Sequence, residues 1–376
     1  MMKKIVLIGG GHSHAIALKY WQTHQLENVK IILVSDVQFT PYSGMLPGLI
    51  AGLYSYEESH IDLKKLAQSV SAQLIIDRVV DIEPEPDRKQ VICASGKIVE
   101  FDLLSIDIGS TPTVGYIKGA RRFATPAKPV PQLLEKWQEI IERAQSEKQL
   151  HQPLNISIIG GGIGGVELAL NMEYKLQQML PDDLFNINLI HQGQRLISDR
   201  NETVSKLITQ VLRKQKIKIY LQTQINQVNQ KSVISKTGEK IRTDYCFLVT
   251  QADAPDWLKE NEIVTDEKGF ILVTQTLQTV NYPYIFATGD ISAIENNPRP
   301  KAGVFAVRQG KPLAKNISKY LSKSRLDPFK PQQKYLSIIG ISNVNGIAIW
   351  GERAWKSPFF WYGKKYLDFN FIKQFK

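Results

Sequence analysis

Cysteine is scarce in this sequence. The 376 residues include only Cys93 and Cys246, which are far apart, and no CxxC or CxxxxC pair occurs. The sequence therefore excludes a local redox-active disulfide and argues against a scaffold stabilised by disulfides. Such cysteine use is typical of a reducing compartment, and we expect a cytoplasmic protein.

Long hydrophobic runs are missing as well. The first apolar run, Ile5–Ile8, ends in three glycines and is too short for the hydrophobic region of a signal peptide. No segment approaches the ~20 apolar residues that a membrane-spanning helix needs. The apolar fraction of 43 % and the charged fraction of 22 % are ordinary for a globular protein, so we expect two or three folded domains.

Basic residues outnumber acidic ones, and most of the excess lies near the C-terminus. The formal net charge is +11, and residues 321–376 alone contain ten basic and three acidic residues. Residues 350–376 also interleave aromatic side chains with lysines, which is the composition of a peripheral membrane contact. The same composition suits a homodimer interface or a flap packed on the rest of the protein. No nucleic-acid-binding module is recognised, so we expect no nucleic acid partner.

A pattern of strand, glycine turn, helix and strand occurs twice, about 150 residues apart. The apolar runs Ile5–Ile8 and Ile31–Val34 enclose the first copy, and Asn155–Ile159 and Asn188–Ile190 enclose the second. Short apolar runs that end in glycine are typical of buried parallel strands. The repeat predicts an α/β fold with two Rossmann-like dinucleotide-binding domains.

Apolar periodicity predicts further elements. Strands are expected at 102–108, 217–221, 244–250, 283–290, 335–341 and 346–350. Helices are expected at 15–22, 133–144, 168–179, 204–214 and 305–317.

The first glycine turn lies in the segment VLIGGGHSHAIAL. Gly9 and Gly11 allow a tight turn and a close approach to a diphosphate, and the following helix presents N–H groups and the positive end of its dipole. His14 stands at the third fingerprint position, normally Gly or Ala, and both His12 and His14 are candidates for phosphate contact. Asp36, one place later than expected, is the candidate acid for the ribose hydroxyls. An ordinary glycine-rich turn is the alternative interpretation.

The second glycine turn lies in ISIIGGGIGGVELAL and matches GxGxxG in full through Gly160, Gly162 and Gly165. Because it follows a predicted strand and precedes a predicted helix, it is the stronger dinucleotide-binding signal. After the next strand, His191 stands where an NADH-selective site carries an acid, and Arg195 is a candidate for the 2′-phosphate of NADPH. A solvated surface charge explains Arg195 equally well, so NADH and NADPH both stay open.

A third segment, YIFATGD, resembles the second FAD signature of two-dinucleotide flavoproteins, in which the Asp hydrogen bonds to the ribityl chain of FAD. By this resemblance Gly289 and Asp290 are FAD-binding residues. The segment LLSIDIGSTP resembles the strand and turn that close the FAD half, which adds Gly109 and Thr111 as candidates. FLVTQADAPDW and GFILVTQTLQT resemble the return from the NAD half. With the two glycine turns included and the last two segments taken as one, these five blocks occur in the same order as in that superfamily.

Within this superfamily the chain is most similar to type II NADH dehydrogenases, and in particular to the related module found fused to selenide, water dikinase. The segments GGGHSH, TPYSGMLPGLIAG, HIDL and PRPKAGVFAVRQG carry the resemblance. In TPYSGMLPGLIAG, Pro41 and Tyr42 belong to a loop that the resemblance places beside the isoalloxazine ring of FAD. Ala302 lies in the last of these segments and is a further FAD-binding candidate.

The resemblance also implies a domain division. Residues 1–115 and 280–325 are expected to form the FAD-binding domain, with an NAD(P)H-binding domain inserted at 116–279. Residues 326–376 are expected to form a C-terminal interface or membrane-surface region.

The chemistry implied is transfer of a hydride from NADH or NADPH to FAD, followed by electron transfer to a quinone-like or other small acceptor. Glu167 lies where the family has a glutamate near the nicotinamide, and a first-turn acid favoured by the helix dipole is the alternative. Lys301 is a candidate to place positive charge beside the reduced flavin, although an exposed loop lysine explains it as well. The competing function is a non-catalytic or sensory flavoprotein partner linked to selenium metabolism.

One departure from the type II dehydrogenases concerns the acceptor. That group has glutamines that line the quinone pocket after the FAD signature. Here Val304 and Arg308 replace two of them, and Gln309 remains. Glutathione-reductase-type and sulfide:quinone chemistry are disfavoured because both need paired cysteines.

Overall fold

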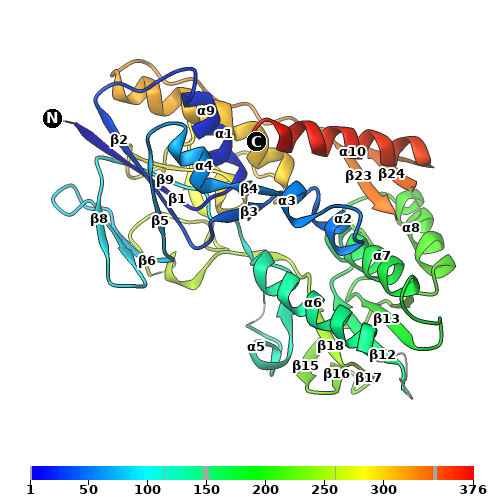
Figure 1. The fold of residues 1–376 in the computed structure, drawn as a ribbon. Coiled ribbons are helices and arrows are strands. Elements are labelled where there is room, and N and C mark those ends of the chain that lie inside the picture. Colours follow the sequence, from blue (N-terminus) through cyan, green and yellow to red (C-terminus); the bar gives the residue numbers. More distant parts are fainter. Residues whose placement is uncertain (1, 114, 147–151, 259, 342–344) are drawn as a thin grey trace.

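Two five-stranded parallel sheets, each covered by helices, form the two halves of the protein (Figure 1). The computed structural model describes residues 2–113, 115–146, 152–258, 260–341 and 345–376. The predicted α/β class with two Rossmann-like units is confirmed.

The sheet of the first unit has the strand order β21-β9-β1-β2-β5. Residues 5–8 of β1 are all buried, without alternation, because the sheet is covered on both faces. Helix α1 (His12–Trp21) packs against α9 (Gly303–Leu321), which comes from the other end of the unit. The strands are β21 (Ile285–Ala287), β9 (Leu103–Ile106), β1 (Lys3–Ile8), β2 (Val29–Ser35) and β5 (Gln73–Ile76).

The sheet of the second unit has the order β11-β18-β12-β13-β14. Its amphipathic helix α6 (Val130–Ser146) buries the apolar side chains that the sequence pattern singled out, from Leu133 to Ala144. Helices α7 (Ile163–Gln177) and α8 (Glu202–Lys214) belong to the same unit. The strands are β11 (Thr125–Pro126), β18 (Tyr245–Leu248), β12 (Leu154–Ile159), β13 (Phe185–Ile190) and β14 (Lys218–Tyr220).

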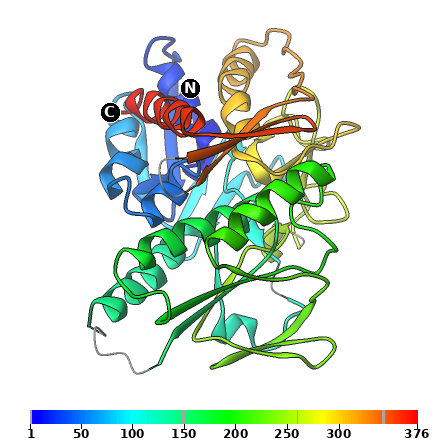
Figure 2. The same cartoon turned by 90° about the vertical axis from the view of Figure 1, so that its right-hand side faces the viewer.

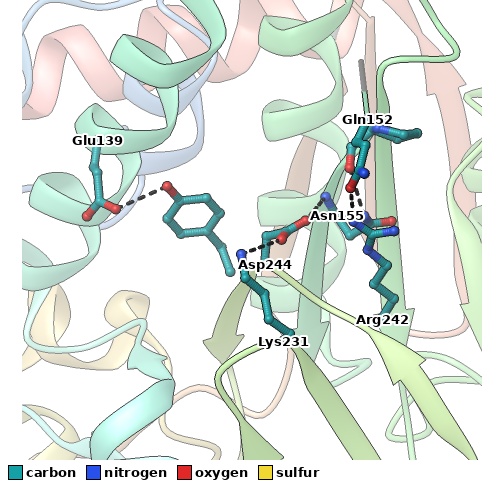
Figure 3. A network of polar contacts seen from close by, with 8 residues as sticks. Glu139, Gln152, Asn155, Lys231, Arg242 and Asp244 are labelled. Carbon is teal, nitrogen blue, oxygen red and sulfur yellow. Dashed lines mark hydrogen bonds and ion pairs between the residues drawn. The ribbon is translucent and has the colours of Figure 1, made fainter. Parts of the chain in front are cut away.

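Polar contacts around the largely buried Asp244 carboxylate join the amino ends of β12 and β18 in the second sheet (Figure 3). The Asp244 carboxylate accepts hydrogen bonds from the Asn155 backbone N–H at 2.9 Å and from Lys231 Nζ at 3.0 Å. The hydroxyl of Tyr245 donates to Glu139 at 3.0 Å and so ties β18 to helix α6. These contacts join the strand that precedes the second glycine turn to its neighbours.

Shorter helices and strands complete both units. In the first unit they are β3 (Phe39–Pro41), α2 (Leu46–Ile50), α3 (Tyr56–Ser59), β4 (His60–Asp62), α4 (Leu63–Gln68), β6 (Val79–Glu83), β7 (Gln90–Cys93) and β8 (Ile98–Glu100). In the second unit they are α5 (Ala120–Phe123), β15 (Ile225–Asn229), β16 (Ser232–Ser235) and β17 (Lys240–Arg242). The chain passes between the two units twice, and the two passages form the paired strands β10 (Thr111–Pro112) and β19 (Ala252–Asp253).

The chain returns to the first unit before residue 280, where the division inferred from the sequence placed this return. Residues 254–279 include η1 (Asp256–Leu258) and β20 (Ile271–Val273), and their apolar side chains belong to the core of the first unit. Strand β20 pairs with β22 (Ser292–Ile294), which follows the turn η2 (Gly289–Ile291). By packing, the inserted unit therefore ends near Gln251 rather than at residue 279.

The C-terminal region spans both units. Strands β23 (Leu336–Ile341), β24 (Asn345–Trp350) and β25 (Arg353–Ser357) form an antiparallel sheet whose isoleucines join the core of the second unit. Helix α10 (Pro358–Lys373) follows, and its Trp361 and Ile372 join the core of the first unit. Figure 2 shows this helix and sheet lying over the junction of the two halves. No helix in the described part of the chain combines the length and the apolar character needed to cross a bilayer.

Candidate functional site

The first site lies where the carboxyl ends of β1, β9 and β21 meet, and it consists of Gly9, Gly11, Asp107, Gly289 and Asp290. Parallel pairing aligns these ends because β9 lies between β21 and β1. Gly9 has a φ of +92°, and a Cβ there would lie 2.4 Å from the Asp107 carbonyl oxygen. Only glycine permits this tight passage from strand to helix.

Asp290 faces a cation from the second unit, Lys128, which lies between β11 and α6. Its Oδ2 atom accepts hydrogen bonds from Lys128 Nζ at 2.7 Å and from the Ser110 hydroxyl at 3.3 Å. Burial opposes ionisation of this carboxyl group, but Lys128 and Lys301 outweigh burial and hold its pKa below the ordinary value. Asp290 is therefore a charged acceptor at neutral pH.

The two histidines of the first glycine turn have different surroundings. His14 is fully buried, and its ring nitrogens contact the Gly9 carbonyl oxygen at 2.7 Å and the Ser105 hydroxyl at 2.8 Å. These internal bonds leave neither nitrogen of His14 for a phosphate, which differs from the expectation. In His12, Nε2 is shielded from solvent and has no hydrogen-bond partner among the residues that the structure describes. Burial lowers the pKa of each histidine to about 4, so both rings are neutral at pH 7.

The remaining candidates of the first unit lie around this site. Asp36 is exposed just beyond β2. Pro41 ends β3, and the next residue, Tyr42, stacks on Phe371 of α10 with ring centroids 4.3 Å apart. Gly109 has a φ of +72° in the turn after β9. Thr111 lies in β10, where its hydroxyl donates to the Asp253 carbonyl oxygen at 3.4 Å.

The second glycine turn follows β12 and has the geometry that the fingerprint predicts. Gly160 has a φ of +131°, and a Cβ there would lie 2.1 Å from the Val249 carbonyl oxygen. A Cβ on Gly165 would lie 1.8 Å from the Gly160 carbonyl oxygen, so this glycine allows helix α7 to pack closely on the strand. Gly162 is the N-cap of α7, and no side chain caps the helix there. The first N–H groups of α7 therefore keep their capacity to bind an anion.

The end of β13 carries His191 beside this turn. Its Nδ1 atom accepts a hydrogen bond from the Gly161 backbone N–H at 3.2 Å, and burial lowers the pKa of the ring. A neutral ring that accepts at Nδ1 carries its proton on Nε2, which is buried, and a backbone hydrogen bond with Arg195 opposes the lowering of the pKa. The guanidinium of Arg195 instead donates to the Ser198 carbonyl oxygen at 3.4 Å.

A cleft of about 1390 Å³ joins the second glycine turn to the first site. Its walls include Gly160, Gly162 and His191 from the second unit, and Gly289 and Asp290 from the first. The cleft thus brings predicted residues of both units to one continuous space.

Two further candidates line the first-unit wall of this cleft, Lys301 and Ala302. Lys301 Nζ donates to the Ser292 carbonyl oxygen at 2.7 Å and lies 3.7 Å from the centre of the Phe270 ring. Burial lowers the pKa of Lys301 to about 8, although Asp290 and Asp266 oppose the shift. Lys301 is thus a cation beside Asp290 at neutral pH and not a loosely exposed loop lysine.

Glu167 lies on the opposite side of helix α7, toward the C-terminal region. Its carboxylate accepts a hydrogen bond from the Gly340 backbone N–H of β23 at 3.2 Å. Burial raises the pKa of Glu167 to about 7, and the nearby Lys364 of α10 opposes this shift. Lys364 and Asp368, both buried, form an ion pair at 2.6 Å, and the hydroxyl of Tyr42 also bonds to Asp368.

Asp107 and Lys128 are the two residues of the first site that sequence reasoning missed. Asp107 carried a usable signal, because an acid directly after a central strand beside a glycine turn must lie at the site. Lys128 carried none, since it belongs to the proline-containing connection and reaches Asp290 only through the fold. Cys93 and Cys246 are buried in the cores of different units, which offers no support for paired-cysteine chemistry.

Comparison with known proteins agrees with this arrangement. The type II NADH:quinone oxidoreductase of Staphylococcus aureus is 23 % identical over 373 residues, which cover 94 % of this chain and 92 % of that protein. The structure of NDH2 from Plasmodium falciparum in complex with NADH has the same fold, with a TM-score of 0.82 at 14 % identity over 100 % of this chain and 98 % of that one. The sulfide:quinone oxidoreductase of Aquifex aeolicus also shares the fold, with a TM-score of 0.80 at 18 % identity over 99 % and 92 % of the two chains.

A sequence model of one family covers most of the chain. It describes the pyridine nucleotide-disulphide oxidoreductases and matches residues 3–310, which include both glycine turns and Asp290. The protein belongs to the pyridine nucleotide-disulphide oxidoreductase family.

Proposed function

We infer that the protein is an FAD-dependent NAD(P)H dehydrogenase that delivers electrons to a quinone-like acceptor. The observation that carries this function is the single cleft that runs from the second glycine turn to Asp290 and Lys301. A nicotinamide cofactor held at one end can reach a flavin held at the other, and hydride transfer depends mainly on such positioning.

The residues of the first site fit FAD. The φ of +92° at Gly9 gives the tight turn into α1, His12 has a shielded ring nitrogen without a partner among the described residues, and Asp290 is a charged acceptor. Gly9, Gly11 and His12 would hold the diphosphate, and Asp290 the ribityl hydroxyls. When bound, FAD accepts a hydride from the nicotinamide and passes two electrons to an acceptor. Lys301 supplies positive charge on the same wall of the cleft.

The second glycine turn fits the diphosphate of NAD(P)H. The uncapped N-terminus of α7 supplies backbone N–H groups, and the His191 ring lines the same cleft. Ser198 and Asp199 also line the cleft, whereas the guanidinium of Arg195 bonds to a backbone carbonyl. We therefore propose to determine the preference between NADH and NADPH by measurement with both cofactors.

The acceptor side is proposed to lie under helix α10. Tyr42 of the loop after β3, Glu167 of α7, and Lys364 and Asp368 of α10 form one buried group of titratable side chains. A quinone needs protons as well as electrons, and a carboxyl group with a pKa of about 7 supplies protons efficiently at neutral pH. The S. aureus relative is named for a quinone acceptor, which supports this class of acceptor.

Stopped-flow spectroscopy tests the proposed function. The FAD-loaded protein is mixed with NADH or NADPH without oxygen, and bleaching of the flavin absorbance is followed. We expect rapid bleaching by at least one nicotinamide, and recovery of the absorbance after a soluble quinone is added. A protein that binds FAD but is not bleached by either cofactor would instead support a sensory flavoprotein, the role compatible with a partner in selenium metabolism.

A further inference from the structure

Asp107 occupies a position at the first site that the proposed function does not explain. It directly follows β9, and its backbone N–H donates to the Ile8 carbonyl oxygen at 2.8 Å. The residue is only 2 % exposed. A fully buried acid in the centre of a nucleotide site needs a physical reason, since burial without a partner is costly.

The carboxylate of Asp107 binds the N-terminus of helix α1. Its Oδ2 atom accepts hydrogen bonds from the backbone N–H groups of Ser13 at 2.8 Å and His14 at 3.1 Å. These groups carry the partial positive charge of the helix end, which a dinucleotide diphosphate ordinarily uses. Asp107 therefore already uses much of the attraction that this helix offers to an anion.

The carboxylate also reaches across the site to Gly289. A Cβ on Gly11 would lie 2.3 Å from Oδ2, and a Cβ on Gly289 would lie 2.4 Å from Oδ1. Asp107 thus fills the space between the two glycine positions proposed to approach FAD. A diphosphate at this site must lie close to the carboxyl group, and two anions at such a distance repel each other strongly when water is excluded.

The charged and titratable groups around Asp107 do not compensate for that repulsion. From α1 come His12 and His14, which are both neutral at pH 7. From η2 comes Asp290, a second carboxylate, which disfavours ionisation of Asp107. Lys128, between β11 and α6 of the second unit, pairs with Asp290, and the positive charge of Lys301 also acts on Asp290.

We propose that Asp107 takes up a proton from solvent when FAD binds, so that the affinity for FAD falls as pH rises. This inference rests on the proposed function. The protonated carboxyl group donates its O–H to a diphosphate oxygen, while its other oxygen continues to accept from the α1 backbone. Repulsion between two anions is thereby replaced by a hydrogen bond.

The direction of the pH dependence follows from linkage. Burial, opposed by the α1 hydrogen bonds, raises the pKa of Asp107 to about 7 in the free protein. A bound diphosphate raises it further. Below pH 7 the group is protonated in both states and the affinity is constant. Above pH 7 the free protein loses the proton first, so the dissociation constant increases by about tenfold for each pH unit.

The test is a titration of flavin-free protein with FAD at pH 6, 6.5, 7, 8 and 9, monitored by quenching of flavin fluorescence. The wild type should bind FAD about equally at pH 6 and 6.5 and progressively more weakly above pH 7. In Asp107→Asn the amide cannot ionise but still accepts from the α1 backbone, so the dissociation constant should stay constant over this range. Glu173→Gln removes a buried carboxyl group of similar pKa on α7, outside the first site, and should retain the wild-type slope.

A second measurement uses the FAD-loaded protein and needs no stable flavin-free form. Dilution to one protein concentration at each pH releases FAD until equilibrium is reached, and the fraction released should rise with pH above 7 in the wild type and in Glu173→Gln but not in Asp107→Asn. An equal slope in Asp107→Asn, or a flat profile in the wild type, overturns the inference while the proposed function stands. Failure of FAD to bind at any pH overturns the proposed function itself.

Discussion

Three buried carboxyl groups illustrate how single residues set the chemistry of this protein. The ammonium group of Lys128, 2.7 Å from Asp290, keeps that acid ionised despite its burial. Asp107 lacks a cation partner among its contacts, and Glu167 has only the more distant Lys364, so burial raises the pKa of both acids to about 7. Asp290 therefore carries a fixed negative charge, whereas Asp107 and Glu167 exchange protons near neutral pH.

Replacing Glu167 by Gln should slow the half-reaction with quinone and spare the half-reaction with nicotinamide. Glu167 does not line the cleft but belongs to the buried group under α10. Without a titratable proton there, we expect the rate of reoxidation by quinone to fall by about a hundredfold, the lower end of the range for a general acid. Stopped-flow measurement of both half-reactions separates the two effects.

The pH profile of the same half-reaction provides a further check. In the wild type the protonated form of Glu167 donates, so reoxidation should decline as pH rises through about 7. In Glu167→Gln the decline should be absent. Glu173→Gln, on the same helix, should behave as the wild type, and equal slowing in both glutamine variants would assign the effect to helix α7 as a whole.

Among the elements, those with a regular apolar pattern were predictable from the sequence and those held by polar contacts were not. Strands β1, β2 and β12 and helix α6 bury continuous or periodic apolar residues. Helix α10 buries Trp361, Lys364, Asp368 and Ile372 on one face. Because a lysine and an aspartate occupy half of that face, no helical apolar period exists in the sequence, and the tail was predicted only by composition.

Residues of the candidate site also differ in how well the sequence predicted them. Gly160 and Gly289 could be assigned because their backbone conformations require glycine. His14 could not be assigned correctly from type and position alone, because its ring bonds to Ser105, which only the fold brings within reach. The role of Arg195 at a 2′-phosphate stays a prediction.

The hydrogen bonds of Asp244 in the second unit should contribute measurably to stability. In Asp244→Ala the Asn155 backbone N–H and Lys231 lose their acceptor, and the Asp244 side chain is only 5 % exposed. An unsatisfied buried donor costs about 1–3 kcal/mol, so we expect the free energy of unfolding to fall by this amount at pH 7. Urea unfolding followed by tryptophan fluorescence measures it, with Trp137 of α6 as a reporter in the same unit.

The sign of the pH effect is set by the low pKa of Asp244. Burial opposes its ionisation, but Asn155 and Lys231 outweigh burial, so its pKa lies below the ordinary value. Its contribution is therefore present above the pKa of the unfolded chain and is lost as pH falls through the folded value. The exposed pair of Asp182 and Lys216 is the matched comparison, and Asp182→Ala should lower the free energy of unfolding by less than Asp244→Ala does.

At the scale of the whole molecule, charge and aromatic side chains are concentrated on one side. Helix α10 lies across both units, as Figure 1 shows, and its outward face exposes Phe359, Tyr362 and Tyr366 with Lys365 beside them. Phe359 is 74 % exposed, more than any other large apolar side chain among the described residues. A face of this kind next to the proposed acceptor side suits a membrane surface that carries a lipid-soluble quinone, with a homodimer as the alternative.

Replacing Phe359, Tyr362 and Tyr366 by Ser should therefore weaken binding to vesicles that contain anionic lipid. Burial of one large apolar side chain contributes ~1.5–3 kcal/mol, so the triple variant should bind about tenfold more weakly or worse. Binding of the wild type should also weaken with salt, because lysines supply part of the attraction. Cosedimentation with vesicles measures both effects. Tyr116→Ser, an exposed aromatic of the second unit, should bind as the wild type does. Unchanged vesicle binding by the triple variant, combined with loss of a dimer in sedimentation velocity, would assign the aromatic face of α10 to contact between two copies of the chain instead.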